Sequence, residues 1–109
     1  FNVWGTGTPK REFLYVDDLS YAIKFLIQNE IDEGLYNIGS GFEISIASLV
    51  DTIAEIVKYE GKIEFDTKYP DGNPRKAIDS SKINKLGWKP KVDIRNGLKI
   101  TYDWYKSSL

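Results

Sequence analysis

Short apolar runs and longer segments of helical periodicity alternate along the chain. The short runs, typical of buried or half-buried strands, are residues 1–4, 13–16, 35–38 and 63–65. Helical spacing of apolar residues is found over 19–26, 46–57 and 94–105. A fourth, shorter helix is expected after residue 80, ended by Gly87. The pattern predicts one mixed α/β unit with short strands and about four helices.

Polar residues that commonly cap helices stand just before each helical segment. They are Asp17 or Asp18, Ser45, Asp79 or Ser80, and Asp93. The first helix is expected to end near residues 28–29, and the inner face of the last one is predicted to carry Ile94, Leu98, Thr101 and Tyr105. The Asp17–Asp18 pair is interpreted as a cap and not as metal ligands, because no His or Cys lies nearby.

Three loops are rich in turn-forming residues: 5–9, 39–41 and 69–74. The loop Gly39-Ser40-Gly41 imitates the start of a dinucleotide-binding fingerprint between a predicted strand and a predicted helix. Ile44 stands where that fingerprint needs a small residue. We therefore interpret this loop as a tight turn and expect no cofactor site in these residues.

Composition narrows the possible functions further. The 109 residues form a single expected domain, 1–109, whose net charge of −1 favours neither nucleic acid nor an acidic membrane. Cysteine and histidine are absent, which removes disulfides, thiolate catalysis and common zinc sites. No apolar stretch approaches the roughly 20 residues of a membrane-spanning helix, so no membrane partner and a cytoplasmic location are expected. Because the chain opens inside a predicted strand and lacks methionine, we expect the natural protein to begin further upstream.

Two stretches carry a more specific signal. The first runs from Val3 to Asp18 and contains Trp-Gly-x-Gly-Thr-Pro-x-Arg-Glu-Phe, and the second is Pro-Asp-Gly-Asn-Pro-Arg-Lys at 70–76. Together with Leu-Gly-Trp-Lys-Pro at 86–90, they resemble the GDP-L-fucose synthase family of extended short-chain dehydrogenases. The resemblance covers nearly the whole chain. It implies that these residues are the small C-terminal substrate-binding portion of such an enzyme.

The resemblance also implies an activity, cofactor and partners. Family members epimerise GDP-4-keto-6-deoxy-mannose at two carbons and reduce the product with NADPH to GDP-L-fucose. The cofactor loop and the catalytic Ser, Tyr and Lys would lie upstream of residue 1, so no catalytic or cofactor-binding residue is predicted here, and the isolated segment is expected to be inactive. The full-length enzyme is expected to bind a GDP-sugar and NADP(H), and to form a homodimer.

Four residues match substrate-contacting positions of that family: Trp4, Arg11, Asp71 and Lys76. Arg and Lys can bind a pyrophosphate through charge-assisted hydrogen bonds. Trp4 can form a flat wall beside a nucleotide, and Asp71 can accept hydrogen bonds from hydroxyls or base edges.

Each of these residues also has a purely structural interpretation. Trp4 would be a half-buried aromatic residue, Arg11 a member of a surface ion pair with Glu12 or Asp17, and Asp71 part of its own turn. For Lys76 the neighbouring Arg75 is the competing candidate, because a register shift of one residue exchanges the two cations.

Two other functions remain open from the sequence. One is the corresponding region of an extended dehydrogenase that acts on a UDP- or dTDP-sugar, since the generic motifs are shared. The other is a stand-alone binding module without a catalytic half. Competition between nucleotides distinguishes a GDP-sugar enzyme from the first alternative. The sequence upstream of residue 1 distinguishes it from the second.

Overall fold

The computed structural model describes all 109 residues as a mixed α/β unit and confirms the predicted class. Its helices are α1 (Val16–Gln28), α2 (Ile46–Val57), α3 (Ser81–Lys85) and α4 (Ile94–Ser107). Its strands are β1 (Asn2–Trp4), β2 (Lys10–Glu12), β3 (Glu43–Ser45), β4 (Glu64–Asp66) and β5 (Arg75–Lys76). None of the helices combines the length and the apolar character needed to cross a membrane.

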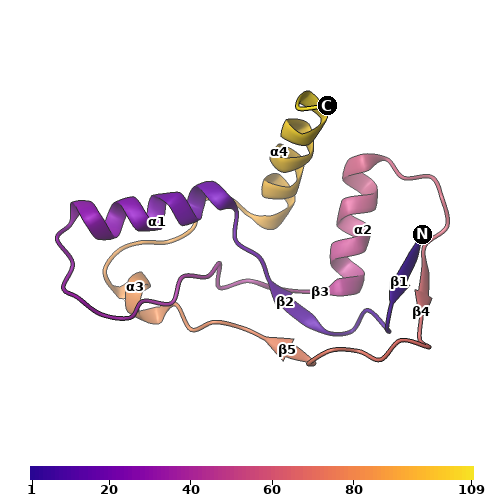
Figure 1. The fold of residues 1–109 in the computed structure, drawn as a ribbon, viewed down its shortest axis with the longest axis horizontal. Coiled ribbons are helices and arrows are strands. Elements are labelled where there is room, and N and C mark those ends of the chain that lie inside the picture. The colour runs from indigo at the N-terminus through magenta and orange to yellow at the C-terminus, as the bar shows by residue number, and fades with distance from the viewer.

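The strands form two small sheets in the elongated molecule, which measures 50 × 34 × 18 Å. In one sheet β1 pairs with β4 in parallel, and in the other β2 lies between antiparallel β3 and parallel β5. Figure 1 shows α1 and α3 at one end, the β1–β4 pair at the other, and the three-stranded sheet between them. The loops that follow β1 and precede β5 are thereby brought together.

Two of the predicted helix caps are confirmed by hydrogen bonds. The Ser45 hydroxyl accepts from the Ser48 amide at 3.1 Å, and Asp93 Oδ1 accepts from the Asn96 amide at 2.9 Å. At α3, Ser80 holds the N-cap position, while Asp79 Oδ1 accepts from the Ser81 amide at 2.9 Å. These caps satisfy backbone donors that a helix start leaves unpaired.

The prediction that Asp17 or Asp18 caps the first helix is wrong. The cap position is Tyr15, and no side chain accepts a capping hydrogen bond there. Asp18 is buried instead, and its two carboxylate oxygens accept from the backbone amides of Lys91 and Val92, each at 3.0 Å. This carboxylate therefore joins the start of α1 to the segment that leads into α4.

Two of the predicted strands are also corrected. The strand expected at 13–16 lies at 10–12, because the partners β3 and β5 pair only with these residues, and α1 already begins at Val16. Residues 35–38 form no strand, since no other segment pairs with them, and Leu35 is exposed. Extended apolar runs become strands only where a partner supplies backbone hydrogen bonds.

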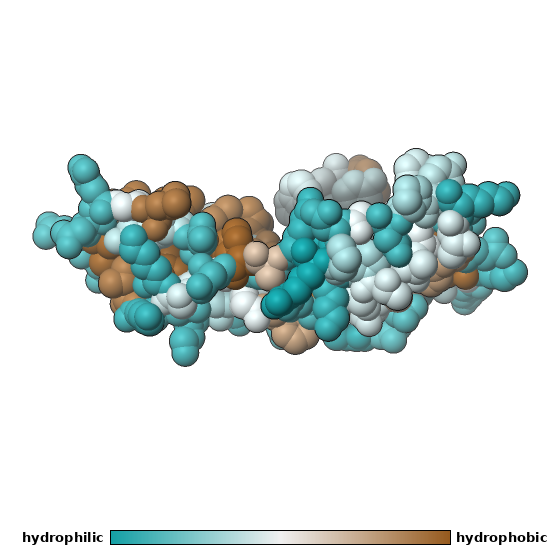
Figure 2. Space-filling view, turned by 90° about the horizontal axis from the view of Figure 1, so that it is seen from below, coloured by the Kyte–Doolittle hydropathy of each residue, from teal (hydrophilic) through white to brown (hydrophobic).

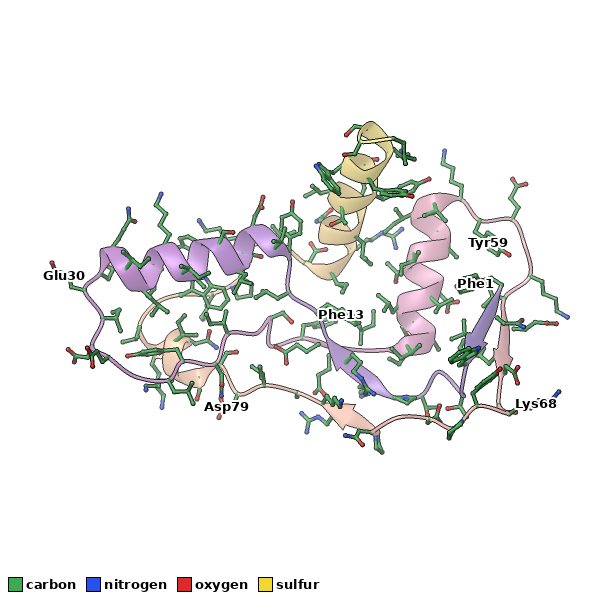
Figure 3. All side chains as sticks on the ribbon, in the orientation of Figure 1. Phe1, Phe13, Glu30, Tyr59, Lys68 and Asp79 are labelled. Atoms are coloured by element: carbon green, nitrogen blue, oxygen red, sulfur yellow. The ribbon has the colours of Figure 1, made fainter.

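The fully buried hydrophobic core consists of Ala22, Ile83 and Trp88, between α1, α3 and the segment after α3. Figure 2 shows apolar surface gathered at this end of the molecule and hydrophilic surface across the middle. At the opposite end, Phe1 and Tyr59 lie beside α2 (Figure 3) and help to line an apolar cavity of about 240 Å³. Tyr105, predicted on the inner face of α4, is instead 54% exposed.

Candidate functional site

Three of the predicted site residues lie on strands, Trp4 on β1, Arg11 on β2 and Lys76 on β5, and the fourth, Asp71, lies on the loop before β5. The backbone hydrogen bond from Lys10 N to Pro74 O, at 2.9 Å, joins the loop before β5 to β2. In the parallel β2–β5 pair, Arg11 is the register partner of Lys76. Residues more than 60 positions apart in sequence thus border one surface.

Trp4 ends β1 and stacks on Tyr69. The two ring centroids are 4.2 Å apart and the ring planes differ by 10°. Trp4 is nevertheless 67% exposed, so the interpretation of Trp4 as a half-buried core aromatic is wrong. An aromatic ring with one face packed and the other accessible can stack with a flat ligand group.

Asp71 connects the two loops. Its Oδ1 accepts from the Thr6 amide at 2.8 Å, and its Oδ2 accepts from the Thr6 hydroxyl at 2.6 Å. The bond from the Thr6 side chain, followed by the one from its backbone, lowers the pKa of Asp71 below its ordinary value of 3.8. We call this pair of hydrogen bonds the Thr6–Asp71 clasp.

Gly5 makes room for the Thr6–Asp71 clasp. Its φ of +88° lies in the left-handed region, and a Cβ atom at this position would lie 2.3 Å from Asp71 Oδ1. Asp71 therefore does more than serve its own turn, because it holds together two loops that are 65 residues apart in sequence.

Arg11 is half-buried and forms no ion pair, so the proposed pairing with Glu12 or Asp17 is absent. Its Nη1 donates to the carbonyl oxygens of Lys10 at 2.7 Å and Asn73 at 2.8 Å. These bonds orient the guanidinium toward the second loop without neutralising its charge. Its Nε and Nη2 donors remain available to an anion.

The adjacent cations Arg75 and Lys76 differ in their partners. Arg75 forms a two-pronged ion pair with Glu43, with Nε–Oε1 and Nη2–Oε2 distances of 2.6 and 2.8 Å. The hydrogen bond from Arg75 lowers the pKa of Glu43, and the same bond raises the pKa of Arg75. Lys76 has no ion pair and no side-chain hydrogen bond. Of the two, only Lys76 therefore has an uncompensated charge.

Lys76 borders a cavity of about 220 Å³ that is also lined by Glu12, Gly39 and Ser40. Glu12 Oε1 accepts from the Gly41 amide at 3.0 Å, and Oε2 accepts from the Ile78 amide at 3.2 Å. A Cβ atom on Gly39 would lie 2.1 Å from Glu12 Oε1. Gly39 thus makes room for a protein carboxylate. A dinucleotide phosphate placed at this loop would meet the negative charge of Glu12.

Sequence reasoning missed three residues that contact the predicted ones, Thr6, Tyr69 and Asn73, and also Glu12, which lines the cavity beside Lys76. All but Glu12 lie in the two turn-rich loops, and Figure 3 shows the labelled Lys68 at the end of the molecule, beside the second of these loops. The position of Thr6, Tyr69 and Asn73 in turn-rich loops was the sequence signal that could have selected them. Their contact partners could not be predicted, because each contact joins segments far apart in the chain.

Known proteins resemble this chain over almost its whole length. Residues 2–101 match the family model described as GDP-mannose 4,6 dehydratase. GDP-L-fucose synthase 1 of Arabidopsis thaliana is 53% identical over 103 residues, which cover 94% of this chain and 32% of that protein. The chain spans about a third of the length of the curated relatives it matches.

Solved structures show the same fold. A GDP-6-OMe-4-keto-L-xylo-heptose reductase from C. jejuni matches with a TM-score of 0.88 and 33% identity, over 99% of this chain and 34% of that one. A GDP-mannoheptose C4 reductase from Campylobacter jejuni with NADP bound matches with a TM-score of 0.82 and 35% identity, over 96% and 34% of the two chains.

Proposed function

Because this chain belongs to the GDP-mannose 4,6 dehydratase family, we propose that it is the GDP-sugar-binding region of a GDP-L-fucose synthase. The complete enzyme would epimerise GDP-4-keto-6-deoxy-mannose and reduce it with NADPH to GDP-L-fucose. NADP(H) would be held by a cofactor domain upstream of residues 1–109, and would supply the hydride. The proposed enzyme is a cytoplasmic homodimer, and residues 1–109 alone have no turnover.

In this proposal Arg11 and Lys76 bind the pyrophosphate of the GDP-sugar. A diphosphate needs local cations, because the net charge of −1 provides no attraction from the chain as a whole. The guanidinium of Arg11 offers two parallel donors to one phosphate, while the ammonium of Lys76 adds a movable charge.

Trp4 and Asp71 would bind the nucleoside end of the ligand. The open face of the Trp4 ring is suited to stacking with a base, and Tyr69 covers its other face. Each Asp71 oxygen accepts one hydrogen bond from Thr6 and keeps acceptor capacity for a hydroxyl or a base N–H. Neither residue transfers a proton to the sugar in this scheme, because both serve recognition.

The observation that carries the proposal is the contrast between Arg75 and the neighbouring cations Arg11 and Lys76. Arg11 and Lys76 are register partners on adjacent strands and have no carboxylate partner, whereas Arg75 is fully engaged by Glu43. Two unpaired cations side by side next to the two loops are suited to an anionic ligand.

The test measures GDP-sugar binding to the full-length protein by titration calorimetry. Arg11→Ala and Lys76→Ala should each weaken binding, by about 2–5 kcal/mol where the contact is desolvated, with NADPH affinity unchanged. Arg75→Ala is the matched control and should bind GDP-sugar like the parent. Arg11→Lys should restore only part of the loss, because a point charge does not replace a planar fork. Parental binding by both alanine variants would remove the pyrophosphate role.

Nucleotide competition tests the base. GDP should compete for the site better than UDP or dTDP, since each polar group left unmatched in a desolvated site costs about 1–3 kcal/mol. Equal competition by all three nucleotides would favour another sugar-nucleotide enzyme of the extended dehydrogenase class.

A further inference from the structure

We infer that Tyr69 is a positioning residue, which holds the Trp4 ring in the orientation that receives the nucleotide base. The inference rests on the proposed function, in which Trp4 contacts the base. Tyr69 itself lies behind Trp4 and acts through it.

The stacking geometry supports this role. With a centroid distance of 4.2 Å and an interplanar angle of 10°, the rings of Trp4 and Tyr69 lie nearly parallel. Trp4 is 67% exposed, so no packed core fixes its rotamer. Tyr69 is the aromatic partner that covers one face of this ring and leaves the other face accessible.

Backbone contacts place Tyr69 behind Trp4. In the β1–β4 pair, Asp66 is the register partner of Trp4. Asp66 then begins a turn, in which its carbonyl oxygen accepts from the Tyr69 amide at 3.3 Å and its Oδ1 accepts from the Lys68 amide at 3.1 Å. The Asp66 carbonyl also accepts from the Gly5 amide at 2.9 Å. The β1–β4 pairing and the turn that begins at Asp66 together place the Tyr69 ring against the Trp4 ring.

The Thr6–Asp71 clasp fixes the same loop two residues further on. Tyr69 is therefore held on both sides, by the Asp66 turn before it and by the clasp after it. A ring held in its bound orientation loses less conformational freedom when a ligand binds, which raises affinity without a new ligand contact. This is the physical effect we assign to Tyr69.

The test compares Tyr69→Ala with Tyr69→Phe in the full-length protein, using GDP and inorganic pyrophosphate as probes. Loss of the stack should raise the Kd for GDP by roughly 2- to 12-fold, the range measured for aromatic pairs. Tyr69→Phe keeps the ring and should bind GDP like the parent. Binding of pyrophosphate, which has no base, should be the same in all three proteins.

A double-mutant cycle with Trp4→Ala separates coupling from independent effects. Once Trp4 is absent, removing Tyr69 should cause no further loss of GDP affinity. Additive losses would overturn the inference, and so would equal weakening of GDP and pyrophosphate, which would indicate general disruption of the loop. If Tyr69→Ala unfolds the protein, Tyr69→Leu replaces it in the same cycle.

The two proposals fail differently in this assay. Parental GDP affinity in Tyr69→Ala, while Arg11→Ala still binds GDP more weakly, overturns the role of Tyr69 and leaves the proposed function standing. A parent protein that binds no GDP overturns the proposed function itself. Parental GDP affinity in Trp4→Ala overturns the base contact and, with it, the inference on Tyr69.

Discussion

Asp18 and Asp71 each join two distant segments of the chain through a carboxylate, but in different regions of the molecule. Each carboxylate accepts two hydrogen bonds from a segment more than 60 residues away in sequence. Asp18 is 3% exposed and lies at the start of α1, beside the buried cluster of Ala22, Ile83 and Trp88. Asp71 is exposed and joins two loops next to unpaired cations.

The environment decides what each carboxylate contributes. The Asp18 carboxylate is buried and its two hydrogen bonds are partly shielded from water, so the contribution of Asp18 is mainly to stability. Water can replace the partner of an exposed group, so the Thr6–Asp71 clasp contributes little to global stability and mainly restricts the loops. We therefore expect mutations at Asp18 to lower folding stability and mutations in the clasp to weaken ligand binding.

The largest effect is expected from Asp18→Ala. It leaves the amides of Lys91 and Val92 without an acceptor and should lower the free energy of unfolding by about 2–4 kcal/mol. Urea denaturation of the full-length protein measures this loss. Asp51→Ala removes an exposed carboxylate from α2 as the control and should change stability by less than about 0.5 kcal/mol. Equal stability of the two variants would break the comparison.

An intermediate effect is expected from Thr6→Val. It removes the hydroxyl bond to Asp71 Oδ2, together with the contacts of that hydroxyl with the Thr8 hydroxyl and amide, but keeps the amide bond to Oδ1. Loosened loops should weaken GDP binding by roughly three- to tenfold, the equivalent of one modest hydrogen bond. Calorimetry checks this, with Thr67→Val as the control, because Thr67 is exposed in the same region and makes no side-chain hydrogen bond. A change in unfolding free energy as large as that of Asp18→Ala would contradict the division of roles.

The smallest effect concerns pH. The hydrogen bonds from Thr6 lower the pKa of Asp71, so their stabilisation of the loops is complete above its ordinary value of 3.8. This stabilisation is lost as the pH falls through the lower pKa of the folded state. Carboxyl-carbon NMR titration should show that lowered pKa in the parent and its return toward 3.8 in Thr6→Val. An unchanged pKa in the variant would mean that the side chain of Thr6 is not the main cause.

The sequence predicted the helices better than the strands. Helices α2 and α4 follow their caps Ser45 and Asp93, because periodicity and capping depend on residues a few positions apart. The strand expected at 35–38 is absent and the one expected at 13–16 is displaced to β2. Strand formation depends on a partner elsewhere in the chain, and apolar runs do not identify that partner.

The residues of the candidate site were predicted from the sequence, but the contacts that hold them in place were not. Residue types and their place beside turn-rich loops were sufficient to select Trp4, Arg11, Asp71 and Lys76. Which of Arg75 and Lys76 is unpaired depends on Glu43, which β3 brings to that face of the sheet. The Thr6–Asp71 clasp and the Trp4–Tyr69 stack could not be predicted either, because nothing in the sequence near Thr6 or Tyr69 identifies the residue that each one contacts.

The sequence by itself determined the α/β class, helices α2 and α4 with their caps, the lack of histidine and cysteine, and the candidate residues in or beside the two turn-rich loops. Only the tertiary structure decided that Asp18 is a buried connector, that Arg75 is engaged, and that Arg11 lies beside Lys76. The physical reason is the range of the interactions. Turns and helices are stabilised within a few residues, whereas these contacts form only after segments 32 to 74 residues apart have met.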